Sequence, residues 1–139
     1  MRKQLALILG LSAGLNAIST TAFAQSPPGT AAVNTLVANN SSTSRNLLSS
    51  ACSATGFTAP LTLDPLPAGS ADSTWCGADT FGTGAISYDD CTVNYGWRPS
   101  FLFPGSAEAF VSTSGDCTAQ VLTSPNPSGL QIIEVRLTN

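Results

Sequence analysis

Apolar and polar residues alternate with a period of two along several short stretches of the chain, as in strands with one buried face. The clearest alternation covers residues 91–97, where the apolar positions are Cys91, Val93, Tyr95 and Trp97. Another covers residues 133–138, where Glu134, Arg136 and Thr138 separate the apolar Ile133, Val135 and Leu137. Both stretches predict strands with an inward and an outward face.

Shorter stretches of the same kind are separated by turn residues. We expect further strands over residues 31–38, 46–52, 61–63, 84–89, 101–103, 109–113 and 117–122. Turn-forming residues interrupt the pattern at 39–42, 67–70, 104–105 and 126–129. About eight short strands without helices between them predict an all-β fold, a small antiparallel sandwich or a small barrel, rather than an α/β fold.

The first 24 residues have the pattern of an export signal. A positive start over residues 1–4 precedes an apolar stretch, and residues 22–24 fit the small-x-small cleavage rule. We therefore expect a mature chain that starts at Gln25, a flexible lead-in over 25–30 and a single β domain over 31–139. The short positive start favours a bacterial protein that is secreted or periplasmic, and no later stretch is apolar for long enough to form a transmembrane helix.

All four cysteines follow the expected signal, at Cys52, Cys76, Cys91 and Cys117. An even number of cysteines in an exported chain indicates two disulfides in an oxidising compartment. Three pairings are open, and the spacings favour Cys52 with Cys76 and Cys91 with Cys117, each closing a loop of about 25 residues. The chain has no C-x-x-C motif and no histidine, which disfavours a metal cluster or a redox pair.

Charge is sparse and mostly negative. The mature chain would keep three arginines and eight acids, so that three positive charges against eight negative ones leave −5. A nucleic-acid binder needs a basic face, and anionic membranes are poor electrostatic partners for the same reason. Without histidine there is no Ser-His-Asp triad, and without lysine there is no Walker phosphate loop. We expect no cofactor.

The segment 95–103 is rich in aromatic residues, with Tyr95, Trp97, Phe101 and Phe103 around Arg98. Two interpretations are open. The rings fill the inner faces of two neighbouring strands, as a sandwich core requires, or they form a stacking platform for a sugar ring or a lipid headgroup. The candidate binding residues are Trp75, Tyr95, Trp97 and Arg98, and the candidate contact region is formed by loops around 70–84 and 96–106.

Five aspartates fall in or near predicted turns, at Asp72, Asp79, Asp89, Asp90 and Asp116. Loop carboxylates are common calcium ligands. The spacing matches no EF-hand, however, and the adjacent Asp89 and Asp90 would point to opposite faces of a strand. Turn formation and solubility are the alternative role of these residues.

One stretch of the chain resembles a known family. Residues 75–79 (WCGAD) and 82–90 (GTGAISYDD) are similar to the C-G-x-[SD]…G-T-x-G stretch of aegerolysin-type β-sandwich proteins. The tryptophan-rich segment that follows in that family is not reproduced. The resemblance implies a sandwich that faces a membrane or a ligand, and it assigns no site residue.

We therefore expect a non-enzymatic binding or surface-interaction module for an extracellular glycan, lipid or protein. The alternative is a structural subunit that assembles through an edge strand, or by donating residues 25–38 with Val33 and Val37 as inserting side chains. Residues 31–38 serve equally as the first strand of the chain's own sheet. A small carboxylate-based hydrolase comes third, because no partner for Asp116 can be identified and no hydrolase motif occurs.

Overall fold

The computed structural model describes residues 31–139 except 55–57 and 124–128. The expected export signal and lead-in, residues 1–30, lie outside the described residues, and so does most of the turn predicted at 126–129. The side chain of Asp79, one of the candidate calcium ligands, is likewise outside the description.

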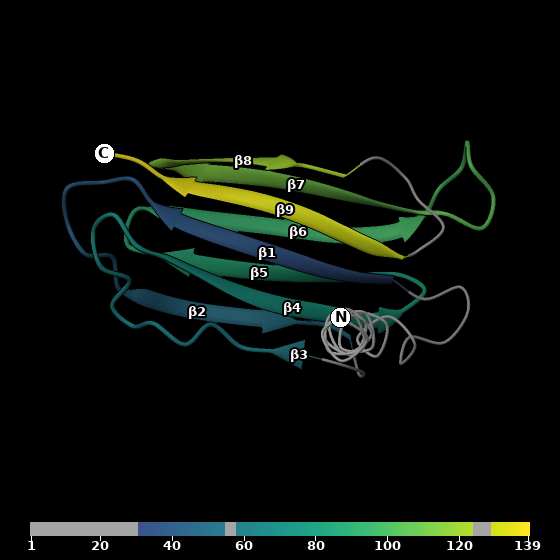
Figure 1. Ribbon diagram of the computed structural model, residues 1–139, viewed down its shortest axis with the longest axis horizontal. Helices are drawn as coiled ribbons and strands as arrows, with labels where there is room; N and C mark the ends of the chain where they lie inside the picture. The colour runs from purple at the N-terminus through teal and green to yellow at the C-terminus, as the bar shows by residue number, and fades with distance from the viewer. Residues whose placement is uncertain (1–30, 55–57, 124–128) are drawn as a thin grey trace, which may run out of the picture.

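The described part of the chain contains nine strands and no helix (Figure 1). The strands are β1 (Ala31–Asn39), β2 (Leu47–Cys52), β3 (Thr58–Ala59), β4 (Ala71–Asp79), β5 (Gly82–Tyr88), β6 (Cys91–Pro99), β7 (Ala107–Gly115), β8 (Cys117–Val121) and β9 (Leu130–Leu137). They form a five-stranded sheet, β3-β4-β1-β9-β8, and a four-stranded sheet, β2-β5-β6-β7. The prediction of an all-β fold is confirmed. None of the described residues belongs to a helix long and apolar enough to cross a membrane.

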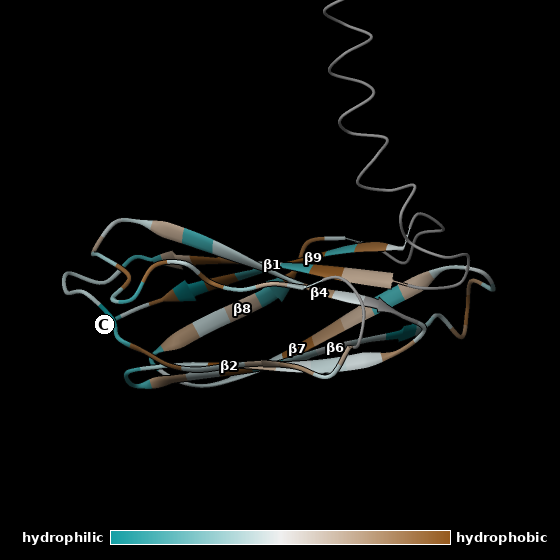
Figure 2. Cartoon of the chain, turned by 90° about the horizontal axis from the view of Figure 1, so that it is seen from below, coloured by the Kyte–Doolittle hydropathy of each residue, from teal (hydrophilic) through white to brown (hydrophobic). Residues whose placement is uncertain are grey.

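The two sheets form two layers around one apolar core (Figure 2). The predicted alternation places the same residues inside: β6 buries Cys91, Val93, Tyr95 and Trp97. From the opposite sheet, β9 buries Ile133, Val135 and Leu137. The first strand, β1, adds Val33, Thr35 and Val37. Period-two alternation in these three strands therefore identifies the core face correctly.

The disulfides join the two sheets. Cys52 of β2 is bonded to Cys76 of β4, and Cys91 of β6 is bonded to Cys117 of β8. Each bond thus takes one cysteine from each sheet, and the pairing favoured by the spacings is confirmed. Each closes a loop, with sequence separations of 24 and 26, and so restricts the unfolded chain.

The five-stranded sheet is mixed, not purely antiparallel. β1 lies between β4, to which it is antiparallel, and β9, to which it is parallel. The antiparallel prediction is wrong at this pair, because the first and last strands are not joined by a hairpin that would dictate their relative direction. Residues 31–38 are flanked on both sides within their own sheet, so they form an internal strand of this chain.

Two local predictions are also corrected. Residues 71–79 form β4, where a loop was expected. Residues 61–63 lie in a loop, where a strand was expected, and only Leu61 of its two leucines is buried. The carboxylate of Asp72 holds this loop, since it accepts hydrogen bonds from the backbone N–H groups of Thr62 (2.6 Å) and Leu63 (2.8 Å).

Candidate functional site

The connection between β6 and β7 carries three adjacent apolar side chains that face solvent. Phe101 is 93% exposed, Leu102 76% and Phe103 56%. Pairing between β6 and β7 ends at Pro99 and Ala107, so the chain leaves the sheet before Phe101. The interpretation that places Phe101 and Phe103 in the core is therefore wrong, because their alternation continues beyond the end of the sheet that would bury them.

Phe81 lies at the same end of the molecule. It occupies the turn between β4 and β5 and is 74% exposed. β5 starts at Gly82 opposite Trp97, near the end of β6, so the turn and the β6–β7 connection both lie at the right-hand end in Figure 1. We call the four side chains Phe81, Phe101, Leu102 and Phe103 the apolar tip. Large apolar side chains gathered in solvent mark a surface for a partner or a membrane.

The β6–β7 connection is held in shape by its own hydrogen bonds. The backbone N–H of Ser100 donates to the carbonyl of Ser106 (2.8 Å), and the N–H of Ser106 donates to the carbonyl of Phe103 (3.0 Å). The hydroxyl of Ser100, a buried residue, accepts from the N–H of Phe103 (3.2 Å). Gly105 supplies the positive φ of 82° that reverses the chain. The tip is therefore presented on an ordered turn.

The charge beside the tip is neutralised within the chain. The guanidinium of Arg98 lies 2.8 Å from the carboxylate of Glu108 across the β6–β7 pair. The same guanidinium lies over the ring of Phe110, 5.8 Å from its centroid. Arg98 lies near the end of β6, and its side chain is 65% exposed. Its charge is shared between a carboxylate and a ring, which leaves the tip mainly apolar.

The four sequence-predicted binding residues do not share one surface. Tyr95 and Trp97 are buried in the core, at 2% and 1% exposure. Trp75 is half-buried on β4, in the other sheet, and Arg98 alone among the four is exposed. Burial also raises the pKa of the Tyr95 phenol to about 12. The segment expected as a loop around 70–84 is mostly strand, with only residues 70 and 80–81 outside β4 and β5. In the segment around 96–106, residues 100–106 form the expected loop, between β6 and β7.

Two of the candidate aspartates, Asp72 on β4 and Asp89 after β5, accept hydrogen bonds from neighbouring segments. Burial opposes the ionisation of Asp72, but the hydrogen bonds from the backbone N–H groups of Leu63, Ser73 and Thr62 outweigh it and lower the pKa of that carboxyl. The carboxylate of Asp89 accepts from the backbone and side-chain nitrogens of Asn46. Among the described residues no group of three or more histidines, cysteines or acids is arranged to hold a metal ion.

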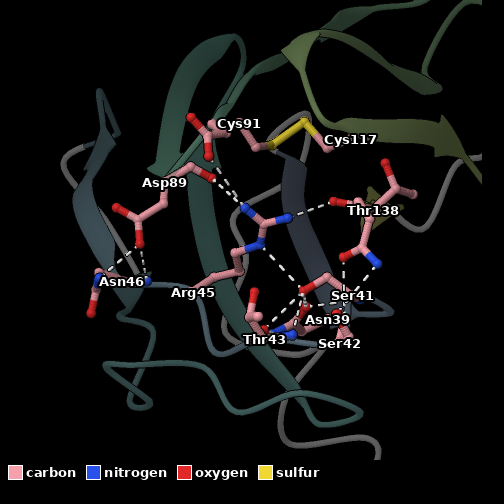
Figure 3. A network of polar contacts seen from close by, with 12 residues as sticks. Asn39, Ser41, Ser42, Thr43, Arg45, Asn46, Asp89, Cys91, Cys117 and Thr138 are labelled. Carbon is pink, nitrogen blue, oxygen red and sulfur yellow. Dashed lines mark hydrogen bonds and ion pairs between the residues drawn. A yellow bond between two sulfur atoms is a disulfide. The ribbon is translucent and has the colours of Figure 1, made fainter.

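A buried arginine, Arg45, lies at the centre of a network of polar contacts (Figure 3). It contacts Thr138, next to the C-terminus, which Figure 1 places at the end opposite to the tip. Arg45 donates through Nε to the hydroxyl of Ser41 (3.3 Å) and through Nη2 to the carbonyl of Thr138 (2.6 Å). Its Nη1 lies 3.4 Å from the carbonyl of Asp89 and 3.5 Å from the carboxylate of Asp90. Each guanidinium nitrogen thus has a partner within the chain, so we assign Arg45 a role in the fold. No local pattern in the sequence indicated this cluster.

Comparison with known proteins supports the fold. No family model and no curated protein matches the chain. Among solved structures, the lipid binding protein Nakanori is similar, with a TM-score of 0.50 and 12% sequence identity over 78% of this chain and 71% of that one. Identity this low shows a shared arrangement of strands and carries no residue of that protein over to this chain.

Proposed function

We propose that the chain is an exported, non-enzymatic β-sandwich module that binds the surface of lipid bilayers through its apolar tip. Phe81, Phe101, Leu102 and Phe103 would enter the interface between headgroups and acyl chains, while both sheets stay in water. The ordered turn around Ser100 and Gly105 presents three of these side chains without a prior change of fold.

The exposure of the tip carries this proposal. Phe101 and Leu102 are more than three-quarters exposed, so they contribute little to the core. Moving a side chain of this kind from water into an apolar phase contributes about 1.5–3 kcal/mol. Several of them at one end of a small protein therefore suffice for reversible attachment to a membrane.

Two similarities point the same way. The structural neighbour Nakanori is named a lipid binding protein. Residues 75–79 and 82–90, which lie on either side of the turn with Phe81, resemble a stretch of aegerolysin-type proteins, and that resemblance implies a sandwich that faces a membrane or a ligand. The name of the structural neighbour favours lipid among the glycan, lipid and protein ligands that the sequence leaves open, and the resemblance agrees with a membrane-facing sandwich.

Electrostatics would contribute little to this binding. The mature chain has a net charge of −5 by count, and the arginine nearest the tip is paired with Glu108. We therefore expect zwitterionic vesicles to bind at least as well as anionic ones, with little dependence on salt. Two disulfides agree with an extracytoplasmic site of action, and secretion or a periplasmic location is part of the proposal.

The test is co-sedimentation of the oxidised mature chain with phosphatidylcholine vesicles. Phe101→Ser and Leu102→Ser should each weaken the partitioning about tenfold, since each removes about 1.5 kcal/mol of transfer free energy. Their thermal unfolding should match that of the wild type, because both side chains lie in solvent.

Leu48→Ser is the matched control. Leu48 is 63% exposed on β2, and its neighbour Leu47 pairs with Tyr88, at the end of β5 remote from Phe81. The proposal requires Leu48→Ser to bind vesicles as the wild type does. Equal losses in the control and the tip variants, or a wild-type chain that stays in the supernatant, would refute it.

A further inference from the structure

The outer face of the four-stranded sheet carries a groove of about 450 Å³. It crosses all four strands, and the side chains that line it on the outer face are Ala51, Thr83, Ala85, Asn94, Phe110 and Ser112. Its volume lies in the range of small-molecule sites. The groove shares no residue with the apolar tip, although Thr83 on its lining lies two residues from Phe81.

The groove is uncharged, and three of the side chains that line its outer face are polar. Asn94 offers an amide, and Thr83 and Ser112 offer hydroxyls. Within the described part of the chain, none of these three side chains has a hydrogen-bond partner. No lining residue carries a charge, so an ionic ligand would be desolvated without a counter-charge. A neutral ligand that both donates and accepts hydrogen bonds fits this lining.

An aromatic ring forms one wall of the groove. Phe110 is 44% exposed, and its ring lies over the α-carbon of Gly96, where any side chain would overlap it. The guanidinium of Arg98 covers another part of the ring, 5.8 Å from the centroid. The ring is therefore in contact with Gly96 and Arg98, and 44% of Phe110 stays exposed on the strand next to Asn94.

The β2 end of the groove is also held in place. The backbone N–H of Ser53 donates to the carbonyl of Thr83, and the N–H of Thr83 donates to the hydroxyl of Ser53, each at 2.8 Å. The disulfide from Cys52 to Cys76 anchors the same stretch to the other sheet. The groove is thus built on rigid strands.

We infer that this groove binds a neutral saccharide. A pyranose has one face of C–H groups, which packs against an aromatic ring, and a rim of hydroxyls, which both donate and accept hydrogen bonds. Phe110 supplies the ring, and Asn94, Thr83 and Ser112 supply the polar partners. The inference is independent of the proposed membrane function, since it uses none of the tip residues.

The experiment is a titration of the oxidised mature chain, labelled with ¹⁵N, followed by two-dimensional NMR. The probes are soluble gluco-, manno- and galacto-oligosaccharides, with oligogalacturonate as the charged counterpart. We expect at least one neutral probe to bind with a millimolar or tighter dissociation constant and to shift the amides of Thr83, Ala85, Asn94 and Phe110. Oligogalacturonate should shift none of them.

Two variants locate the site. Phe110→Ala and Asn94→Ala should each weaken binding of the same probe about tenfold. Ser114→Ala is the control, because Ser114 faces outward on the same strand, β7, but does not line the groove. All three residues are exposed, and dispersed amide spectra check that the variants fold. Shifts outside the groove, unchanged binding by Phe110→Ala and Asn94→Ala, or no shift with any neutral probe would overturn the inference.

Binding to vesicles distinguishes a sugar that is a lipid headgroup from a sugar that belongs to a free glycan. Phosphatidylcholine vesicles are compared with and without a galactolipid. If the galactolipid increases binding of the wild type but not of Phe110→Ala, the sugar is a lipid headgroup. If only free oligosaccharides bind, it is a soluble or cell-wall glycan, and either result supports the groove. Phe101→Ser should keep the sugar-induced shifts, which separates a failure of the tip from a failure of the groove.

Discussion

The ring of Tyr95 lies over the α-carbon of Gly84, its register partner on the neighbouring strand. A methyl group at Gly84 would overlap the ring and its hydroxyl. Trp97 lies in the same way over Gly82, two residues after Tyr95 on β6 and two residues before Gly84 on β5. The two glycines of β5 therefore provide the space for the two largest side chains of β6, inside the core.

Gly84→Ala should destabilise the fold by about 1–3 kcal/mol, because the added methyl group forces a buried ring out of its place. Urea unfolding measures the loss. Thr83→Ala is the matched control, since Thr83 is exposed on the outer face of the same strand, and we expect a change below about 0.5 kcal/mol. A Gly84→Ala chain as stable as the wild type would mean that the ring moves without loss of packing.

The two tyrosines of the chain should ionise only at high pH. Burial raises the pKa of both Tyr95 and Tyr88 to about 12, and for Tyr88 the carboxylates of Asp72 and Asp64 act in the same direction. A phenol in the unfolded chain ionises near pH 10. Because the folded pKa lies above the unfolded one, the contribution to stability is complete below about pH 10 and is lost as the pH rises toward 12.

Phenolate absorbance as a function of pH measures this shift. The wild type should show a midpoint near 12 in buffer and near 10 in denaturant, and Tyr88→Phe should halve the amplitude without creating a lower midpoint. Absorbance that develops around pH 10 in the folded protein would show that the phenols are open to solvent.

The aromatic segment 95–103 shows what the alternation of apolar residues predicts correctly and where that prediction fails. Alternation places Tyr95 and Trp97 in the core, and the structure agrees. The same alternation continues through Phe101 and Phe103, which are exposed because the sheet ends at Pro99. Where a sheet ends depends on its partner strands, and a local pattern does not contain that information. Three of the four apolar-tip residues therefore lie in a segment that the sequence identified, but the sequence did not predict that they are exposed.

Contacts between distant parts of the chain could not be predicted from the sequence either. The cysteine spacing identified both disulfides, since the loops they close are local in the chain. The parallel pairing of β1 with β9 joins the two ends of the domain, and no turn between them specifies a direction. Arg45 and Thr138 are also far apart in the chain, and their hydrogen bond forms only where the fold brings the two segments together.

Replacing Arg45 tests how much its contact with Thr138 and its other partners stabilises the fold. Arg45→Ala removes the hydrogen bonds that Arg45 donates to the hydroxyl of Ser41 and to the carbonyls of Thr138 and Asp89, and should cost about 2–4 kcal/mol of stability in urea unfolding. Arg45→Lys should recover only part of this, because one ammonium group cannot span all three acceptors. Arg136→Ala, which removes an exposed ion pair with Glu134, should cost less than about 1 kcal/mol. Similar losses in both alanine variants would contradict the role of Arg45.

Asp72 should make the stability of the chain depend on acidic pH. Its pKa in the fold is lowered from 3.8, because the N–H groups of Leu63, Ser73 and Thr62 outweigh the opposing effect of burial. A lowered pKa adds stability above the unfolded value, and this is lost as the pH falls through the folded one. Asp72→Asn should therefore lose about 1 kcal/mol near pH 7, and the difference from the wild type should shrink below pH 3.8. Asp116→Asn, whose parent side chain is exposed, is the control and should match the stability of the wild type near pH 7. A deficit in Asp72→Asn that persists unchanged in acid would show that the shape of the side chain, and not its charge, holds the 61–63 loop against β4.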